Sequence, residues 1–318
     1  MMSDNNEIKT NSWRAWYLAA RPKTLTGAAT PVIIGIALAL KTVGTDSFQA
    51  VPALLCLLFA WLMQIESNFI NDYFDYIHGN DDTATRLGPK RACAEGWITL
   101  PAMRLGIIVI SILAAIAGIP LIWYGGWQMI IVGAACLLFA FLYTTVFSYH
   151  GMGDMLVLIF FGIVPVCLTY YVIVPGEEQS IPFDVLVISI ACGLIIDTLL
   201  CINNYRDRDN DRRDGKKTLV VRLGTRYGGV LYLATGLTGS IITLCVLLNM
   251  ALGLGTVSIA IINTVLCLVY LFLHIKTFQS MIRIGHGREL NKVLGLTARN
   301  IFIYGIITFF NIILLGIA

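Results

Sequence analysis

Two stretches of the sequence gather oxygen-bearing side chains at the ends of long apolar runs. The first lies within residues 68–82 and the second within residues 203–214. On a helix, one face of the first would carry Gln64, Asn68, Asn71, Asp72 and Asp75. One face of the second would carry Asp197, Asn204, either Asp207 or Arg208, and Asp211. Mg²⁺ prefers oxygen ligands and is commonly held by one or two carboxylates plus substrate phosphates, so each stretch is a candidate metal site.

Basic residues are interleaved with these acids. The stretch 81–95 includes Arg86, Lys90 and Arg91, and the stretch 206–226 holds eight Lys or Arg residues and four Asp residues. A phosphate needs Lys and Arg, whereas the metal that bridges it needs carboxylates. Two such clusters at one membrane face therefore predict a pocket for a diphosphate that is bridged by Mg²⁺.

The composition indicates how these stretches are held. Of the 318 residues, 57% are hydrophobic and only 13% are charged, whereas a soluble protein carries about 25% charged residues. We therefore predict an all-α, multi-pass membrane protein, embedded in the lipid bilayer as one domain over residues 1–318, and find no support for nucleic-acid binding. Nine helical spans are expected, at about 25–41, 50–75, 100–124, 127–147, 153–175, 182–206, 228–249, 252–276 and 298–317. The eight scattered cysteines form no C-x-x-C pair and indicate neither disulfides nor a metal site.

The distribution of charge predicts the orientation. The N-terminal segment and the loops after the second, sixth and eighth spans, with their flanks, hold 21 of the 22 Lys and Arg residues, and Lys41 is the exception. The loop after the fifth span instead carries Glu177, Glu178 and Asp184. By the positive-inside rule, the N-terminus and the two acidic motifs face the cytoplasm and the C-terminus lies outside, in a cell (inner) membrane.

A membrane location constrains the substrate. A diphosphate with a long apolar tail would place its head at the cytoplasmic rim and its tail between helices. The allylic cation left when diphosphate departs would need apolar or aromatic walls. The candidate aromatic residues are Tyr143, Tyr149, Phe160 and Phe161. A divalent-cation transporter is the alternative from another class, but it would place its carboxylates near the bilayer midplane, with a path to both sides.

The sequence resembles the UbiA superfamily of intramembrane prenyltransferases, whose two motifs commonly read N-D-x-x-D-x-x-x-D and D-x-x-x-D. The first motif here is Asn71-Asp72-x-x-Asp75, but Gly79 stands at the position of its last Asp, with Asp81 two residues further on. This departure and several local strings resemble the 1,4-dihydroxy-2-naphthoate polyprenyltransferase branch. These strings are Ala20–Leu25, Gly88-Pro89 with Arg91, Gly151–Asp154 followed by Phe160-Phe161-Gly162, Asn203-Asn204-x-Arg206-Asp207, and Gly215–Gly224.

The resemblance implies a nine-helix bundle with its active site facing the cytoplasm. Its implied metal ligands for Mg²⁺ are Asp72, Asp75, Asp207 and Asp211, supported by Asn68, Asn71 and Asn204. Diphosphate contacts are expected from Arg86, Lys90, Arg91 and Lys216, while Arg21 and Lys23 could reach either substrate. Asp154 is a candidate contact to the aromatic substrate or a helix N-cap.

The implied reaction transfers a polyprenyl group from its diphosphate to dihydroxynaphthoate, with loss of the carboxylate, to give demethylmenaquinol. Within the superfamily, the alternative is another aromatic acceptor such as 4-hydroxybenzoate.

Overall fold

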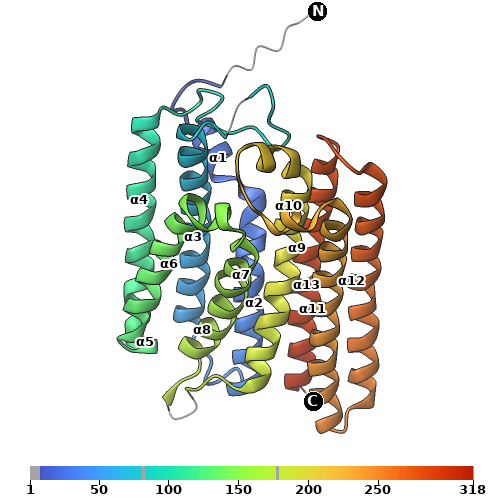
Figure 1. Ribbon diagram of the computed structural model, residues 1–318. Coiled ribbons are helices and arrows are strands. Elements are labelled where there is room, and N and C mark those ends of the chain that lie inside the picture. Colours follow the sequence, from blue (N-terminus) through green and yellow to red (C-terminus); the bar gives the residue numbers. More distant parts are fainter. Residues whose placement is uncertain (1–7, 81–82, 177–178, 318) are drawn as a thin grey trace, which may run out of the picture.

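The computed structural model describes residues 8–80, 83–176 and 179–317, and these residues form a bundle of long helices without strands (Figure 1). Within them, nine helical segments are long and apolar enough to cross a membrane. They are α2 (Pro22–Val43), α3 (Ala50–Ile77), α4 through α5 (Leu100–Gly125), α6 (Gln128–Thr145), α7 through α8 (Gly153–Ile173), α9 (Phe183–Arg213), α11 (Thr225–Gly253), α12 (Val257–Ile284) and α13 (Leu290–Ile317). The prediction of an all-α protein with nine membrane-spanning helices is confirmed.

Several helices extend further than their apolar runs predict. Helix α9 continues to Arg213, α12 to Ile284, and α13 begins at Leu290 rather than near residue 298. Hydropathy marks the part of a helix that suits hydrocarbon, but the backbone remains helical beyond it. Both acidic stretches consequently lie on the last turns of long helices, which fixes the direction of their side chains.

Small residues allow the helices to approach closely. A Cβ added to Gly162 would lie 2.5 Å from the Cα of Gly193 on α9, and one added to Gly35 would lie 2.7 Å from the carbonyl oxygen of Val166. In membranes, where lipid is as apolar as the helix surfaces, such close packing is a principal source of helix association. Helix α9 is the central helix of the bundle and contacts α2, α7, α8, α10 (Leu219–Leu223), α11 and α13.

The fifth span is interrupted. Helix α7 (Gly153–Leu158) passes through a π-helical turn at Ile159–Ile163 into α8 (Val164–Ile173). Pro165 lies just beyond this turn, and its missing N–H removes a backbone hydrogen bond, which accounts for the irregular winding. The turn packs against α9 and helps to seat the start of α7 beside that helix.

One end of the bundle is elaborated with additional structure. The short helix α1 (Trp13–Ala20), the residues 83–99 between α3 and α4 (the α3–α4 segment) and α10 all lie toward this end (Figure 1). Helix α13 ends at the opposite side, as an odd number of spans requires. The acidic ends of α3 and α9 both point to the elaborated end.

Candidate active site

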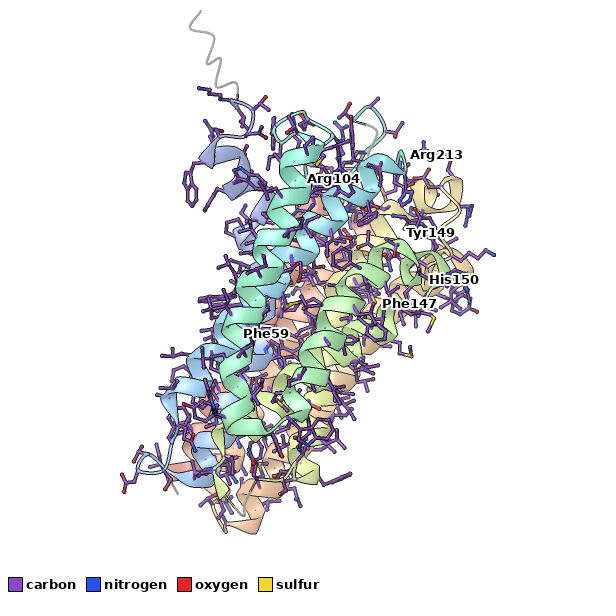
Figure 2. All side chains as sticks on the ribbon, turned by 90° about the vertical axis from the view of Figure 1, so that its left-hand side faces the viewer. Phe59, Arg104, Phe147, Tyr149, His150 and Arg213 are labelled. Atoms are coloured by element: carbon purple, nitrogen blue, oxygen red, sulfur yellow. The ribbon has the colours of Figure 1, made fainter. Side chains whose placement is uncertain are left out.

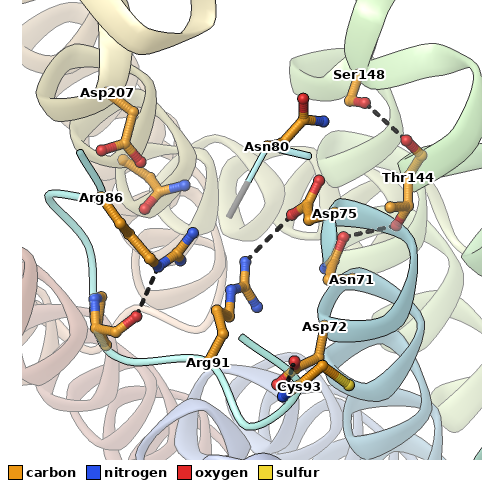
Figure 3. Close-up of polar contacts among 12 residues, drawn as sticks. Asn71, Asp72, Asp75, Asn80, Arg86, Arg91, Cys93, Thr144, Ser148 and Asp207 are labelled. Carbon is orange, nitrogen blue, oxygen red and sulfur yellow. Dashed lines mark hydrogen bonds and ion pairs between the residues drawn. The ribbon is translucent and has the colours of Figure 1, made fainter. Parts of the chain in front are cut away.

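The polar side chains near the end of α3 point in two directions. Gln64, Asn71 and Asp75 line a large cavity. Asn71 is held there because its Oδ1 accepts a hydrogen bond of 2.6 Å from the Thr144 hydroxyl on α6. Figure 3 shows Asn71 and Thr144 beside Asp75. Gln64, Asn71 and Asp75 form the α3 side of the site.

Asn68 and Asp72 lie on the neighbouring strip of the same helix and do not line the cavity. Asn68 donates to the carbonyl of Ala20 and to the Thr24 hydroxyl, both at 3.0 Å. The two carboxylate oxygens of Asp72 accept the backbone N–H groups of Ala92 and Cys93, each at 2.9 Å. Asp72 is 1% exposed. It thus anchors the α3–α4 segment, and Asn68 anchors the start of α2.

Asp75 is the electrostatic centre of the α3 side. Its Oδ2 lies 3.5 Å from Arg91 Nη2, and its Oδ1 lies 3.3 Å from Lys216 Nζ. Charge-assisted hydrogen bonds between such groups are usually about 2.7–2.9 Å long. The longer contacts, together with the several lone pairs of a carboxylate, leave Asp75 able to take a further ligand.

Lys216 comes from the loop after α9 and reaches across to α3. Burial by itself lowers the pKa of this ammonium, but Asp75 and Asp211 outweigh that effect, and the net pKa is raised. Lys216 therefore stays protonated at neutral pH. Its Nζ also lies 5.5 Å from the centre of the Tyr149 ring, whose hydroxyl accepts a hydrogen bond from Asn80. Tyr149 does not itself line the cavity.

Helix α9 supplies the opposite side. Asn204, Asp207 and Asp211 all line the cavity, and Asp207 faces the Asp75 group in Figure 3. The i, i+4 spacing places the two carboxylates one turn apart on one face.

Arg206, which sequence reasoning did not single out, connects the two sides. Its guanidinium contacts both oxygens of Asp207, with Nε–Oδ1 at 2.8 Å and Nη2–Oδ2 at 2.5 Å. It also donates to Asn291 on α13, and Asn291 donates to the carbonyl of Leu87 in the α3–α4 segment, both at 2.8 Å. The string Asn203-Asn204-x-Arg206-Asp207 was the signal for Arg206, but nothing in the sequence indicated Asn291.

The α3–α4 segment carries three of the predicted phosphate contacts. Arg86, Lys90 and Arg91 all line the cavity. Arg86 Nε donates to the Pro89 carbonyl at 2.8 Å, which folds this side chain back over its own segment (Figure 3). Lys90 pairs with Glu95 at 2.8 Å and is largely exposed, whereas Arg91 reaches Asp75 of the first acidic motif. Asp81, the alternative to Gly79, lies outside the described residues.

The cavity has a volume of about 1420 Å³ and changes character with depth. Polar side chains gather at the elaborated end, whereas the deeper walls are apolar, including Phe59, Met129 and Val172. Figure 2 shows Tyr149 and Arg213 toward that end and Phe59 well below them. Tyr143, Phe160 and Phe161 line the cavity, but Asp154 does not. The space therefore suits a molecule with a charged head and a long apolar tail.

The donor set suits a hard divalent cation. Asp75, Asp207 and Asp211 offer carboxylate oxygens to one space, and Asn71 and Asn204 add amide oxygens. This all-oxygen set is the kind that Mg²⁺ prefers. Lys216 and Arg91 both contact Asp75, so two positive charges lie beside this donor set.

Comparison with known proteins identifies the family. The model of the UbiA prenyltransferase family matches residues 28–283. The chain belongs to this family. The 1,4-dihydroxy-2-naphthoate octaprenyltransferase of Escherichia coli (strain K12) is 35% identical over 75% of this chain and 77% of the relative. The Haemophilus influenzae protein of the same name is also 35% identical, over 69% of this chain and 72% of the relative.

Solved structures of UbiA homologues share the fold. The apo homologue from Aeropyrum pernix K1 has a TM-score of 0.64 at 18% identity, with 90% of this chain and 98% of that chain covered. The Archaeoglobus fulgidus homologue, solved with GPP and Mg²⁺ bound, has a TM-score of 0.57 at 15% identity, with 94% and 99% covered. At these identities the likeness concerns the arrangement of the helices.

Proposed function

We propose that this UbiA-family protein transfers a polyprenyl group from polyprenyl diphosphate to 1,4-dihydroxy-2-naphthoate, with loss of the carboxylate, to form demethylmenaquinol. The assignment of the acceptor rests on the 35% identity, over three quarters of the chain, to a protein named for that activity. The assignment of the donor is supported by a cavity with carboxylates and cations at one end and apolar walls beyond.

We assign each residue a role from its position relative to the cavity. Asp75, Asp207 and Asp211 would hold Mg²⁺, which as a Lewis acid would neutralise charge on the departing diphosphate. Lys216 and Arg91 bind phosphate oxygens and stabilise the negative charge that grows on them as the C–O bond breaks. Arg206 orients Asp207 through its two contacts. We assign Asp72 to fixing the α3–α4 segment that carries Arg91, in place of a metal ligand.

The deeper part of the cavity receives the apolar tail and shields the allylic cation. Tyr143 and Phe160 present aromatic rings below the polar end, where ring faces stabilise a cation while water is excluded. Phe160 is itself fixed by Phe139, whose ring centroid is 5.0 Å away. The cavity thus separates the charged departing group from the reacting carbon.

We infer that the elaborated end faces the cytoplasm of a cell (inner) membrane, with the C-terminus outside. The excess of Lys and Arg at this end supports that orientation by the positive-inside rule. The carboxylates gather at one end of the cavity, and apolar walls lie beyond them. This arrangement favours a prenyltransferase over a divalent-cation transporter, whose metal ligands would lie near the bilayer midplane.

The experiment compares two acceptors. Purified protein is incubated with Mg²⁺, a polyprenyl diphosphate and either dihydroxynaphthoate or 4-hydroxybenzoate, and products are analysed by mass spectrometry. We expect a prenylated naphthalenediol from the first acceptor and no product from the second. Product from 4-hydroxybenzoate alone would retain the prenyl transfer but overturn the acceptor. Uptake of a metal tracer into proteoliposomes without any prenyl substrate would favour the transporter instead.

A further inference from the structure

Two acidic side chains, the partly buried Asp154 and the buried Asp197, lie behind the wall of the cavity. On α9, Ile196 and Leu200 line the cavity, whereas Asp197 and Cys201 do not. Asp154, in the first turn of α7, meets this second face of α9. One carboxylate oxygen from each aspartate and the sulfur of Cys201 all lie within 4.8 Å of one another. Asp197 is 4% exposed and Cys201 is fully buried.

The hydrogen bonding of this cluster is incomplete. Cys201 Sγ donates to Asp197 Oδ2 at 3.5 Å. The remaining Oδ1 of Asp197 and the Oδ1 of Asp154 are both buried without a hydrogen-bond partner. Within the described part of the chain, neither carboxylate forms an ion pair with Lys or Arg. Two unpaired carboxylates would be very costly at this depth, but a proton held between them lets one carboxyl group donate to the other.

Tyr143 connects the cluster to the cavity. This residue lines the cavity, and a Cβ added to Gly153, the neighbour of Asp154, would lie 3.7 Å from its hydroxyl oxygen. The start of α7 therefore lies between the buried Asp197 of α9 and the cavity wall at Tyr143.

The proposed reaction needs a proton to leave and to return. When the ring carbon bonds to the prenyl cation, the neighbouring ring hydroxyl becomes a carbonyl and releases its proton. Loss of CO₂ then leaves the electron pair of the broken C–C bond in the ring as an enolate, which must regain a proton to become the product hydroxyl. The proton count is unchanged over the cycle, so a site that is sealed from water and returns the proton is sufficient.

We propose that Asp154 and Asp197 hold one shared proton and exchange a second one with the ring hydroxyl of the acceptor through Tyr143. As the ring hydroxyl gives its proton to the Tyr143 oxygen, Tyr143 passes its own proton to the Asp154 carboxylate. The reverse transfer reprotonates the enolate after CO₂ has left. The exchange step rests on the proposed function, whereas the shared proton does not.

Infrared spectroscopy on the full-length protein without substrates tests the shared proton. At neutral pH, exposed aspartates are ionised, so a protonated carboxyl group at this site gives a C=O stretching band that shifts in D₂O. We expect the wild-type minus Asp197→Asn difference spectrum to contain this band, and the same for Asp154→Asn. Asp209→Asn, at an exposed position on α9, is the matched control without the band. Absence of the band in both difference spectra would overturn the proposal. So would a stoichiometric bound divalent metal that is lost in Cys201→Ala.

Kinetics tests the exchange step. We expect Asp154→Asn and Tyr143→Phe each to lower kcat by about 10²-fold or more, the usual range for a proton-transfer group. The KM for the prenyl diphosphate and the thermal unfolding temperature should be retained. Asp197→Asn should lose less activity, because its amide can still donate to the Asp154 carboxylate. Wild-type kcat in Asp154→Asn and Tyr143→Phe would overturn the exchange step. The infrared measurement contains no substrate, so its result would stand even if the proposed acceptor were wrong.

Discussion

Replacing Asp75 or Asp207 with Asn is expected to lower kcat by about 10²–10³-fold or more, because each change removes a carboxylate ligand of the Mg²⁺ that would neutralise the departing diphosphate. In Asp75→Asn, Lys216 and Arg91 lose the carboxylate that positions them. In Asp207→Asn, the two-point contact with Arg206 is lost. The measurement is turnover of polyprenyl diphosphate with purified variants at saturating Mg²⁺, with circular dichroism to verify folding.

Asp72→Asn is the informative comparison, since Asp72 belongs to the same acidic motif but faces the α3–α4 segment. An amide can accept only one of the two backbone N–H groups. We therefore expect the free energy that holds the α3–α4 segment in place to fall by about 1–3 kcal/mol. The segment should become more susceptible to protease, and kcat should fall less than in Asp75→Asn. Asp209→Asn should behave as wild type. Equal loss of kcat in Asp72→Asn and Asp75→Asn, with unchanged protease susceptibility in Asp72→Asn, would contradict this division of roles.

Removing divalent cations is expected to have an effect of similar size. With three carboxylates offered to one space, the diphosphate and the protein would repel each other without an intervening cation. Chelation should lower turnover by at least about 10²-fold, and added Mg²⁺ should restore it. Binding provides a second readout: a prenyl thiodiphosphate that does not react should bind in calorimetry with Mg²⁺ and not with the chelator.

Two results would contradict the metal assignment. Tight binding of the analogue in the presence of chelator would mean that Lys216 and Arg91 suffice for the diphosphate. Unchanged Mg²⁺ dependence of binding in an Asp75→Asn/Asp207→Asn double variant would place the metal elsewhere.

The sequence predicted the helices and the general position of the site because both depend on local patterns. Apolar runs long enough to span a bilayer indicate helices, and the acidic motifs occur at their polar ends. The sequence could not show that the α3 motif points in two directions. Asp72 and Asp75 are about 60° apart around a helix and were assigned to one face. Which strip faces the cavity depends on where the α3–α4 segment and α9 pack.

Contacts between distant parts of the chain explain what remained unpredicted. Asn291 reaches the site only because α13 packs against α9, and its distance in sequence from either motif gave no signal. Asp154 and Asp197 carry no shared local motif, but the packing of α7 on α9 brings them together. Arg91 and Lys216 were expected as phosphate contacts from the family resemblance and their charge, and the structure adds that both contact Asp75.

The most direct test of the proposed reaction follows the acceptor's carboxyl carbon. Dihydroxynaphthoate labelled with ¹³C at the carboxylate is incubated with the protein, Mg²⁺ and polyprenyl diphosphate, and released CO₂ and prenylated product are both quantified. We predict one labelled CO₂ for each molecule of product, no label in the product, and no CO₂ when the diphosphate is omitted. A prenylated product that keeps the label, or CO₂ release without the prenyl donor, would contradict the account.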